Sequence, residues 1–179
     1  VNIEHTLPSV LCGDPKRIKQ VLLNILVNAA KYTKEGSVTL TANAESISDK
    51  RCKITVSVAD TGIGIKKEVI DRIFDSFSRA DSSEINRIEG TGLGLSICKQ
   101  LMDLMGGEIT VDSIYTKGSV FSIVLEQDII DGSPIGNIDF LAKKEGEHTK
   151  FRHLFEAPDV RVLVVDDNDA SRMVTVKLL

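Results

Sequence analysis

The most regular pattern in the chain is a set of apolar residues spaced by three and four between positions 15 and 32. Such spacing predicts an amphipathic helix. Gly13-Asp14-Pro15 comes just before it, and an aspartate N-cap followed by proline favours a helix start at that point. We expect this helix to form one side of the core, through Ile18, Val21, Leu22, Ile25, Leu26 and Ala29.

Elsewhere the chain alternates apolar and polar residues, which predicts strands. The pair 37–47 and 52–59 is expected to be antiparallel, with its connection near 48–50. Two more strands are expected at 108–113 and 119–126. The remaining expected elements are short edge strands near Ile3 and Val10-Leu11, a short helix at 66–74, and a helix at 96–105 that ends at Gly106-Gly107.

The polar side of the first helix carries candidate chemistry. Gln20, Asn24 and Asn28 recur every four residues, with Lys31 three beyond. Asparagine is a poor helix former. A single one would be explained as a solvated face, but two aligned carboxamides beside a lysine fit a binding site better. An amide oxygen is a suitable ligand for Mg²⁺.

A second candidate feature is Asp60-Thr61-Gly62-Ile63-Gly64, directly after a predicted strand. Glycine lets the backbone approach a flat ligand or adopt positive φ. The aspartate could accept a hydrogen bond from an amine-bearing ring. Taken alone, the same residues also describe an ordinary turn.

A third feature is Gly90-Thr91-Gly92-Leu93-Gly94-Leu95, directly before the helix expected at 96–105. Glycines that open a helix leave backbone N–H groups available for phosphate. The spacing is neither a Rossmann fingerprint nor a Walker loop. The polar stretch 78–89 before it is interpreted as a lid or as disorder, and Phe74 and Phe77 as core aromatics or as part of the site.

Composition narrows the function classes. The 179 residues carry a net charge of −4 and no basic block, so no nucleic-acid partner is expected. Cys12, Cys52 and Cys98 form no C-x-x-C pair and are read as reduced, core or near-core thiols in a cytoplasmic setting. No apolar run reaches transmembrane length, and no direct membrane contact is expected. The chain starts without Met and is expected to be a piece of a longer protein, whose membrane anchor, if any, would lie outside it.

Taken together and in this order, these motifs resemble the catalytic, ATP-binding domain of sensor histidine kinases. The resemblance covers residues 1–126 and places the chain in the superfamily of gyrase, heat-shock chaperone and mismatch-repair ATPases. It implies a two-layer α/β sandwich of the Bergerat type, in which helices cover one face of a mixed sheet. It also implies ATP and Mg²⁺ as cofactors.

The resemblance further implies roles for individual residues. Asn28 would bind Mg²⁺, and Asn24 and Lys31 would be the catalytic residues near the phosphates. Asp60 would bind the adenine amino group. The full set of implied ATP contacts is Asn24, Asn28, Lys31, Tyr32, Asp60, Gly62, Gly64, Ile65, Phe74, Gly90, Thr91, Gly92, Leu93, Gly94 and Leu95.

One position distinguishes the branches of this superfamily. Where the hydrolytic members have a glutamate as base for water, this chain has Asn24, which cannot take a proton. That favours a kinase over an ATPase. The lid differs from the family pattern at Arg79, Asn86 and Glu89, where members commonly have glutamine, arginine and glycine.

The end of the chain changes character. Residues 127–158 are interpreted as a linker. Residues 159–179 resemble the first strand and helix of a receiver domain, in which Asp166 and Asp167 would bind Mg²⁺ only if the domain were intact. The alternative is a lone surface strand. His5, His148 and His153 are interpreted as ordinary surface or linker histidines.

The sequence therefore predicts the ATP-binding domain of a hybrid sensor histidine kinase. Its phosphoacceptor histidine would lie on a dimerisation domain upstream of Val1, so we expect this chain to bind ATP without phosphorylating itself. The alternatives are a hydrolytic ATPase and a non-catalytic nucleotide-binding scaffold. The chain alone is expected to be a monomer and the intact kinase a homodimer.

Overall fold

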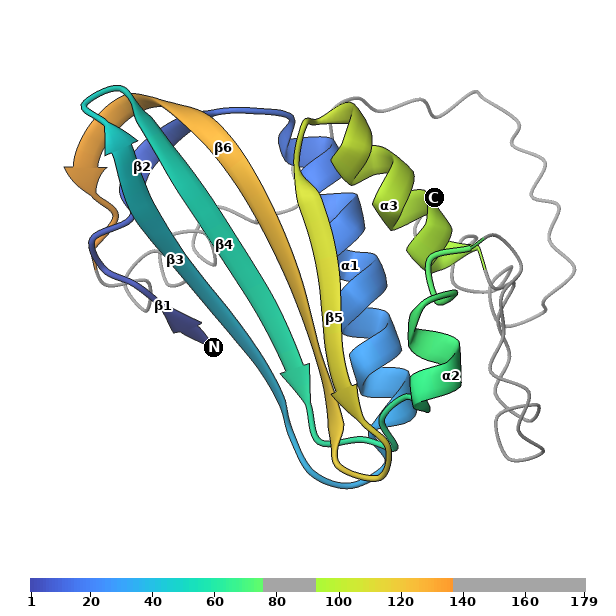
Figure 1. Cartoon of the computed structure of the whole chain (residues 1–179). Helices are drawn as coiled ribbons and strands as arrows, with labels where there is room; N and C mark the ends of the chain where they lie inside the picture. The colour runs from blue at the N-terminus through green and yellow to red at the C-terminus, as the bar shows by residue number, and fades with distance from the viewer. Residues whose placement is uncertain (76–92, 137–179) are drawn as a thin grey trace, which may run out of the picture. The chain divides into compact units, whose positions relative to one another are not determined.

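The computed structural model describes residues 1–75 and 93–136, all within the first of the two units into which the chain divides, Val1–Leu141. Figure 1 labels the elements. In chain order they are β1 (Asn2–Ile3), β2 (Pro8–Cys12), α1 (Pro15–Tyr32), β3 (Val38–Ser48), β4 (Arg51–Asp60), α2 (Lys67–Ile70), α3 (Gly94–Leu104), β5 (Glu108–Ile114) and β6 (Gly118–Pro134).

The described strands form one mixed sheet in the order β1-β3-β4-β6-β2. The edge strand β1 runs parallel to β3, and the other described pairs are antiparallel. The long strand β6 pairs with β5 along its first half and with β2 along its second half. The helices lie on one side of this sheet (Figure 1). The predicted two-layer α/β sandwich is confirmed.

The first helix begins and ends where its pattern predicts. Hydrogen bonds between neighbouring residues fix its start. The side chain of Asp14 accepts hydrogen bonds from the backbone N–H groups of Lys16 and Arg17, both at 3.1 Å. Arg17 Nε also donates to Asp14 Oδ2 at 3.1 Å. The Arg17 N–H is the main cause that lowers the pKa of the Asp14 carboxyl. The aspartate therefore caps the helix in its charged form.

The core lies between the helices and the sheet. Val21, Ile25 and Ala29 of α1 are buried, and Cys98 and Met102 of α3 are fully buried beside them. Strands β4 to β6 close the core with Val58, Ile109, Phe121, Ile123 and Leu125. Only part of the predicted apolar side of α1 is fully buried. Ile18, Leu22 and Leu26 pack against the edge of the core and remain half-buried.

Two predicted elements have other lengths in the structure. The helix predicted at 66–74 is only Lys67–Ile70, and beyond it the hydrogen bonds are of the tighter i→i+3 kind, as from Arg72 N–H to Val69 O. Val69 and Ile70 are β-branched, which lowers helix propensity. The last strand, predicted to end at 126, continues to Pro134. Residues 127–134, predicted as the start of a linker, are held in the sheet by β2.

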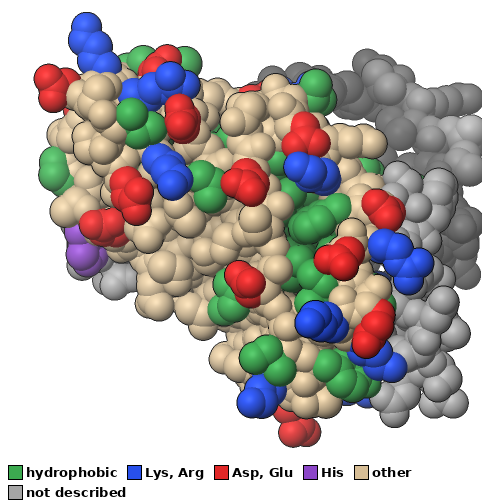
Figure 2. Space-filling model, viewed as in Figure 1, with side chains coloured by type: hydrophobic (Ala, Val, Ile, Leu, Met, Phe, Trp, Pro, Cys, Tyr) green, Lys and Arg blue, Asp and Glu red, His purple; other side chains and the backbone are tan. Residues whose placement is uncertain are grey.

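The described surface is charged, and it includes one of the cysteines. Figure 2 shows acidic and basic side chains interspersed over the visible face. Cys52 and Cys98 are buried free thiols, as predicted, whereas Cys12 is exposed and not a core residue. His5 is exposed, as expected, and its Nδ1 lies 3.0 Å from the carbonyl of Gly136. Among the described helices, none combines the length and apolarity that crossing a membrane requires.

Candidate functional site

The loop after β4 is closed by the side chain of its own first residue. Asp60 is only 9% exposed, and its Oδ1 accepts the backbone N–H of Gly62 at 2.9 Å. An ionised carboxylate has two acceptor oxygens and can accept several hydrogen bonds. The loop uses one of these oxygens, which leaves Oδ2 as the atom that could meet the predicted adenine amino group.

The two glycines of this loop are required by close packing within the protein. A Cβ on Gly62 would overlap the carbonyl oxygen of Tyr32 at the end of α1. Gly64 has φ of 63°, and a Cβ there would overlap the carbonyl oxygen of Ile114. Glycine is therefore needed at both positions before any ligand binds. Close approach of these glycines to a nucleotide stays a prediction.

Hydrogen bonds tie the loop to two neighbouring elements. Ile63 N–H donates to Tyr32 O at 3.2 Å, and Thr116 N–H donates to Ile63 O at 2.8 Å. Ile65 N–H donates to Ser113 Oγ at 2.8 Å. Ser113 is not among the residues predicted from the sequence, although it is polar and occupies an inward position of the alternating strand β5. That combination was the available signal.

Beside the loop lies a polar atom without a partner. The side-chain oxygen of Thr33, the residue that ends α1, is buried and has no hydrogen-bond partner among the described residues. It lies 2.8 Å from the position that a Cβ on Gly62 would occupy. Buried polar atoms are nearly always paired. A bound polar group at the loop would satisfy this one, so the residues present fit a ligand here.

The polar side of α1 approaches the start of α3. Asn24, Asn28 and Lys31 are half-buried, whereas Gln20 is exposed. The Cγ of Asn24 lies 4.0 Å from the position that a Cβ on Gly94 would occupy. One turn further along α3, the Cys98 thiol donates to Val21 O at 3.8 Å. The middle of α1 and the first turn of α3 therefore face each other across Asn24.

At the end of the same helix side, the Nζ of Lys31 lies 5.3 Å from the ring centre of Tyr32. A cation at this distance is attracted to the ring face. The carbonyl of Tyr32 in turn holds the Asp60 loop. Asn24, Asn28 and Lys31 thus form a polar ridge on α1. This ridge runs from the start of α3 to the loop after β4.

Several predicted ATP contacts also have structural roles. Ile65, Phe74 and Leu95 pack against the core cluster, and contact with a nucleotide stays a prediction for each of them. Leu93 and Gly94 begin α3, where Ser96 Oγ donates to Leu93 O at 2.9 Å. The predicted contacts Gly90, Thr91 and Gly92, the aromatic Phe77, the lid positions Arg79, Asn86 and Glu89, and the residues His148, His153, Asp166 and Asp167 lie outside the described residues.

For a metal, the described residues offer a simple donor set. Among residues 1–75 and 93–136, no three His, Cys, Asp or Glu side chains gather as a metal cluster. Asn28 offers a carboxamide oxygen on the ridge. Mg²⁺ commonly takes one or two protein ligands and completes its coordination with substrate phosphates and water. This donor set fits a Mg²⁺ that arrives with a nucleotide.

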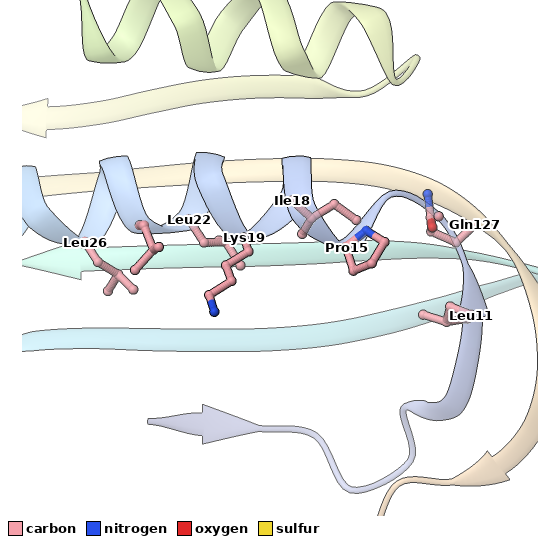
Figure 3. A pocket seen from close by; sticks show the side chains of 9 residues that line it. Leu11, Pro15, Ile18, Lys19, Leu22, Leu26 and Gln127 are labelled. Atoms are coloured by element: carbon pink, nitrogen blue, oxygen red, sulfur yellow. The ribbon is translucent and has the colours of Figure 1, made fainter. Parts of the chain in front are cut away.

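A groove of about 570 Å³ lies elsewhere on α1 (Figure 3). At 100° per residue, its α1 residues lie roughly opposite Asn24 and Asn28. Its lining is mostly apolar and so differs from the candidate site. The groove is lined by Leu11, Gly13, Pro15, Ile18, Lys19, Leu22, Leu23, Leu26 and Gln127.

Comparison with protein families gives one match, to the family described as "Histidine kinase-, DNA gyrase B-, and HSP90-like ATPase", over residues 13–129. This range includes α1, the Asp60 loop, the start of α3 and most of β6. It covers more than half of the chain.

Individual relatives match two thirds of the chain or nearly all of it. The chain is 44% identical over 119 residues to the sensor protein GacS of Pseudomonas syringae pv. syringae, which covers 66% of the chain and 13% of GacS. It is 42% identical over 123 residues to hybrid signal transduction histidine kinase B of Dictyostelium discoideum, covering 69% of the chain and 6% of that protein. With RpfC of Xanthomonas campestris pv. campestris it shares 35% over 196 residues, covering 99% of the chain and 26% of RpfC. The chain thus spans a small part of these relatives.

Solved structures of histidine kinases also match this chain. The full-length ShkA structure in complex with AMPPNP matches with a TM-score of 0.59 and 32% identity, over 73% of this chain and 25% of that one. The mycobacterial sensor histidine kinase MprB matches with a TM-score of 0.52 and 27% identity, over 74% of this chain and 83% of that one. Fold, motif order and sequence similarity agree, and the chain belongs to the histidine kinase-, DNA gyrase B- and HSP90-like ATPase family, as an ATP-binding catalytic domain of the sensor histidine kinase type.

Proposed function

We propose that this domain binds Mg²⁺-ATP along the polar side of α1 and transfers the γ-phosphoryl group to a histidine on a separate dimerisation domain. The observation that carries the proposal is that α1 contacts two other parts of the candidate site, the Asp60 loop and the start of α3. The end of α1 holds the Asp60 loop, and its middle faces the start of α3. Tyr32 lies eight positions after Asn24, which corresponds to about 12 Å along the helix at a rise of 1.5 Å per residue. An extended nucleotide fits such a span.

The adenine would lie at the Asp60 loop. The carboxylate is held in place by the N–H of Gly62, so its orientation is set before a ligand arrives. The Thr33 side-chain oxygen, which has no hydrogen-bond partner within residues 1–75 and 93–136, offers a second polar group beside it. A preorganised acceptor loses little freedom on binding, which favours affinity. Tyr32 would lie beside the nucleotide, with Lys31 over its ring.

The phosphates would lie between the middle of α1 and the start of α3. Asn28 would hold Mg²⁺, and Lys31 and Asn24 would contact the phosphate end. Bound Mg²⁺ supplies charge neutralisation on the phosphates. The protein's own contribution is to position the phosphoryl group for in-line attack. The N-terminus of α3 favours negative charge through its backbone dipoles.

Phosphoryl transfer is favoured over hydrolysis by the residue at position 24. A carboxamide cannot accept the proton of an attacking water, whereas a glutamate could. The side chain of Asn24 is half-buried between α1 and α3 and faces Gly94. The described site therefore supports transfer to a supplied nucleophile. Steady release of ADP without any acceptor would favour the hydrolytic ATPase instead.

The partners of the domain follow from the same proposal. We infer that the phosphoacceptor hairpin belongs to the same protein, that the intact kinase is a cytoplasmic homodimer, and that this chain alone is a monomer. Residues 159–179 would begin a receiver domain that accepts the phosphoryl group in a relay. The 42% identity to hybrid signal transduction histidine kinase B of Dictyostelium discoideum supports a hybrid arrangement.

The test is a transfer reaction in which this chain, γ-labelled ATP and Mg²⁺ are mixed with the upstream segment of the same protein. We expect acid-labile label on the upstream segment and none on this chain. Asn28→Ala should abolish the label, and Asn43→Ala, which removes an exposed carboxamide on β3, should not. Label on a histidine of this chain alone would contradict the proposal, as would ADP formed with no labelled acceptor.

A further inference from the structure

The Asp60 loop, residues 60–65, packs against the turn that joins β5 and β6. In this turn the N–H of Thr116 donates to Ile63 O at 2.8 Å. A Cβ on Gly64 would overlap the carbonyl oxygen of Ile114 at the end of β5. Backbone atoms make both contacts, so they do not depend on the identity of a side chain in the turn. The next loop residue is held differently, by a side chain of β5.

That side chain is Ser113, whose hydroxyl has three hydrogen-bond partners. Its Oγ accepts the N–H of Ile65 at 2.8 Å and donates to the carbonyl of Gly118 at 2.9 Å. Ser119 Oγ lies 3.0 Å away. A hydroxyl has a single proton, so Ser119 must be the donor within the serine pair. With one bond donated and two accepted, the Ser113 hydroxyl has its full set of partners inside the protein.

These partners connect the two ends of the Asp60 loop. Ile65 is the last residue of the loop and is bound directly by Ser113. Gly118 lies against the first residue, because a Cβ on Gly118 would overlap the carbonyl oxygen of Asp60. Ser119 is the partner of Asp60 in the pairing of β4 with β6, and such partners project from the same face of the sheet. Ser113 therefore joins Ile65 to the part of β6 that contacts Asp60.

We propose that Ser113 is a positioning residue for nucleotide binding, whose hydroxyl keeps the Asp60 loop in the conformation that presents the Asp60 carboxylate to a ligand. The proposal rests on the function proposed above. Ser113 acts through Asp60 and does not touch the nucleotide. When a binding-competent conformation is populated only in part, the apparent affinity falls by the same fraction. Loss of this hydroxyl should therefore weaken binding although no contact with the nucleotide is removed.

The effect should belong to the adenine end of the site. In the proposed function Asn28 holds Mg²⁺ at the phosphate end, whereas Ser113 acts at the loop that would receive the base. Ser113→Ala should therefore weaken binding of ATP by the same factor in Mg²⁺ and in EDTA. Asn28→Ala should instead remove only the gain in affinity that Mg²⁺ provides.

The sheet offers a matched control at Ser57. Its Oγ lies 2.9 Å from Ser122 Oγ, so it also belongs to a serine pair across neighbouring strands. Ser57 and Ser113 are both half-buried. Ser57 precedes Asp60 by three residues on β4 and so projects from the opposite face of the sheet. Ser57→Ala removes a comparable hydroxyl and should leave the Asp60 loop unchanged.

The first test needs no nucleotide and measures hydrogen exchange of the Ile65 amide in the whole chain. We expect exchange about 2–10-fold faster in Ser113→Ala than in wild type, the equivalent of one net hydrogen bond. Ser113→Thr keeps the hydroxyl and should restore slow exchange, and Ser57→Ala should retain the wild-type rate. Equal exchange of Ile65 in Ser113→Ala and wild type would overturn the proposal.

The second test is calorimetric titration with ATP. Ser113→Ala should weaken binding about 2–10-fold in Mg²⁺ and in EDTA alike, and Ser113→Thr should restore it. In an Asp60→Asn background the loss should be smaller, because the two residues act as a unit. Fully additive losses would overturn the proposal, as would an equal loss in Ser57→Ala. If wild type bound no ATP, the proposed function would fail, while the exchange of Ile65 would still decide whether Ser113 holds the loop.

Discussion

At the scale of single residues, two glycines with a left-handed backbone differ in how closely another part of the backbone approaches them. Gly64 and Gly106 both have positive φ, 63° and 69°. A Cβ on Gly64 would meet the carbonyl of Ile114, whereas a Cβ on Gly106 would meet nothing within 4 Å. The two positions therefore share the cost of a strained backbone and differ only in the steric overlap.

This pair gives a matched test of why the Asp60 loop carries glycine. Gly106→Ala should lower the free energy of unfolding by about 1–2 kcal/mol, the cost of placing a non-glycine residue at positive φ. Gly64→Ala should cost more, by a further 1–3 kcal/mol or so, because the β5–β6 turn must move away. The measurement is urea unfolding of both variants. Equal losses would show that overlap with Ile114 does not determine the choice of glycine.

At the scale of elements, the start of α1 depends on a charged cap. The pKa of Asp14 is lowered in the folded chain, chiefly by the N–H of Arg17. A carboxyl with a lowered pKa adds stability above its unfolded pKa, and this is lost as pH falls through the folded value. The effect is small because the group is exposed and screened by solvent.

A pH series on Asp14→Asn tests the cap. Asparagine is also a good N-cap residue but does not titrate in this range. Wild type should be the more stable protein at pH 6, and the difference should shrink as pH falls below the ordinary value of 3.8. The check is the thermal midpoint of both proteins between pH 6 and pH 2. A difference that stays constant over this range would contradict a charged cap.

The sequence predicts an element well where local signals determine its bounds, and poorly where pairing with a distant segment determines them. The bounds of α1 are set by local signals, a proline, a cap and a periodic apolar side, and they were predicted correctly. The end of β6 is set by pairing with β2, more than 100 residues earlier, so periodicity could not reveal it. The same holds for Ser113, whose hydrogen bond with Ile65 joins elements that are distant in sequence.

At the scale of the whole molecule, the sheet determines where the domain ends. The second half of β6 pairs with β2 at four positions, from Cys12 with Asp128 to Pro8 with Pro134. Residues 135 and 136 extend this contact, since Ile135 N–H donates to Leu7 O at 2.7 Å. A domain that ended at Glu126, the boundary predicted from the sequence, would leave β2 without a partner.

Truncation measures this contribution. A chain that ends at residue 126 should be less stable than one that ends at residue 136 by about 2–6 kcal/mol. This assumes a net contribution of about 0.5–1.5 kcal/mol from each of the three pairings other than that of the two prolines, and from the hydrogen bond between Ile135 and Leu7. The comparison is urea unfolding of the two truncated chains. Indistinguishable stabilities would mean that the second half of β6 does not belong to the folded unit.

In the proposed function, one nucleotide bridges the Asp60 loop and the polar side of α1 that carries Asn24 and Asn28. Calorimetric titration of this chain with ATP, in Mg²⁺ and then in EDTA, tests it most directly. Asn28→Ala should remove the gain in affinity that Mg²⁺ provides. Asp60→Asn should weaken binding about 10-fold or more in both conditions, because a hydrogen bond to a charged group is lost. ATP affinities that equal the wild-type values in both variants would contradict the account.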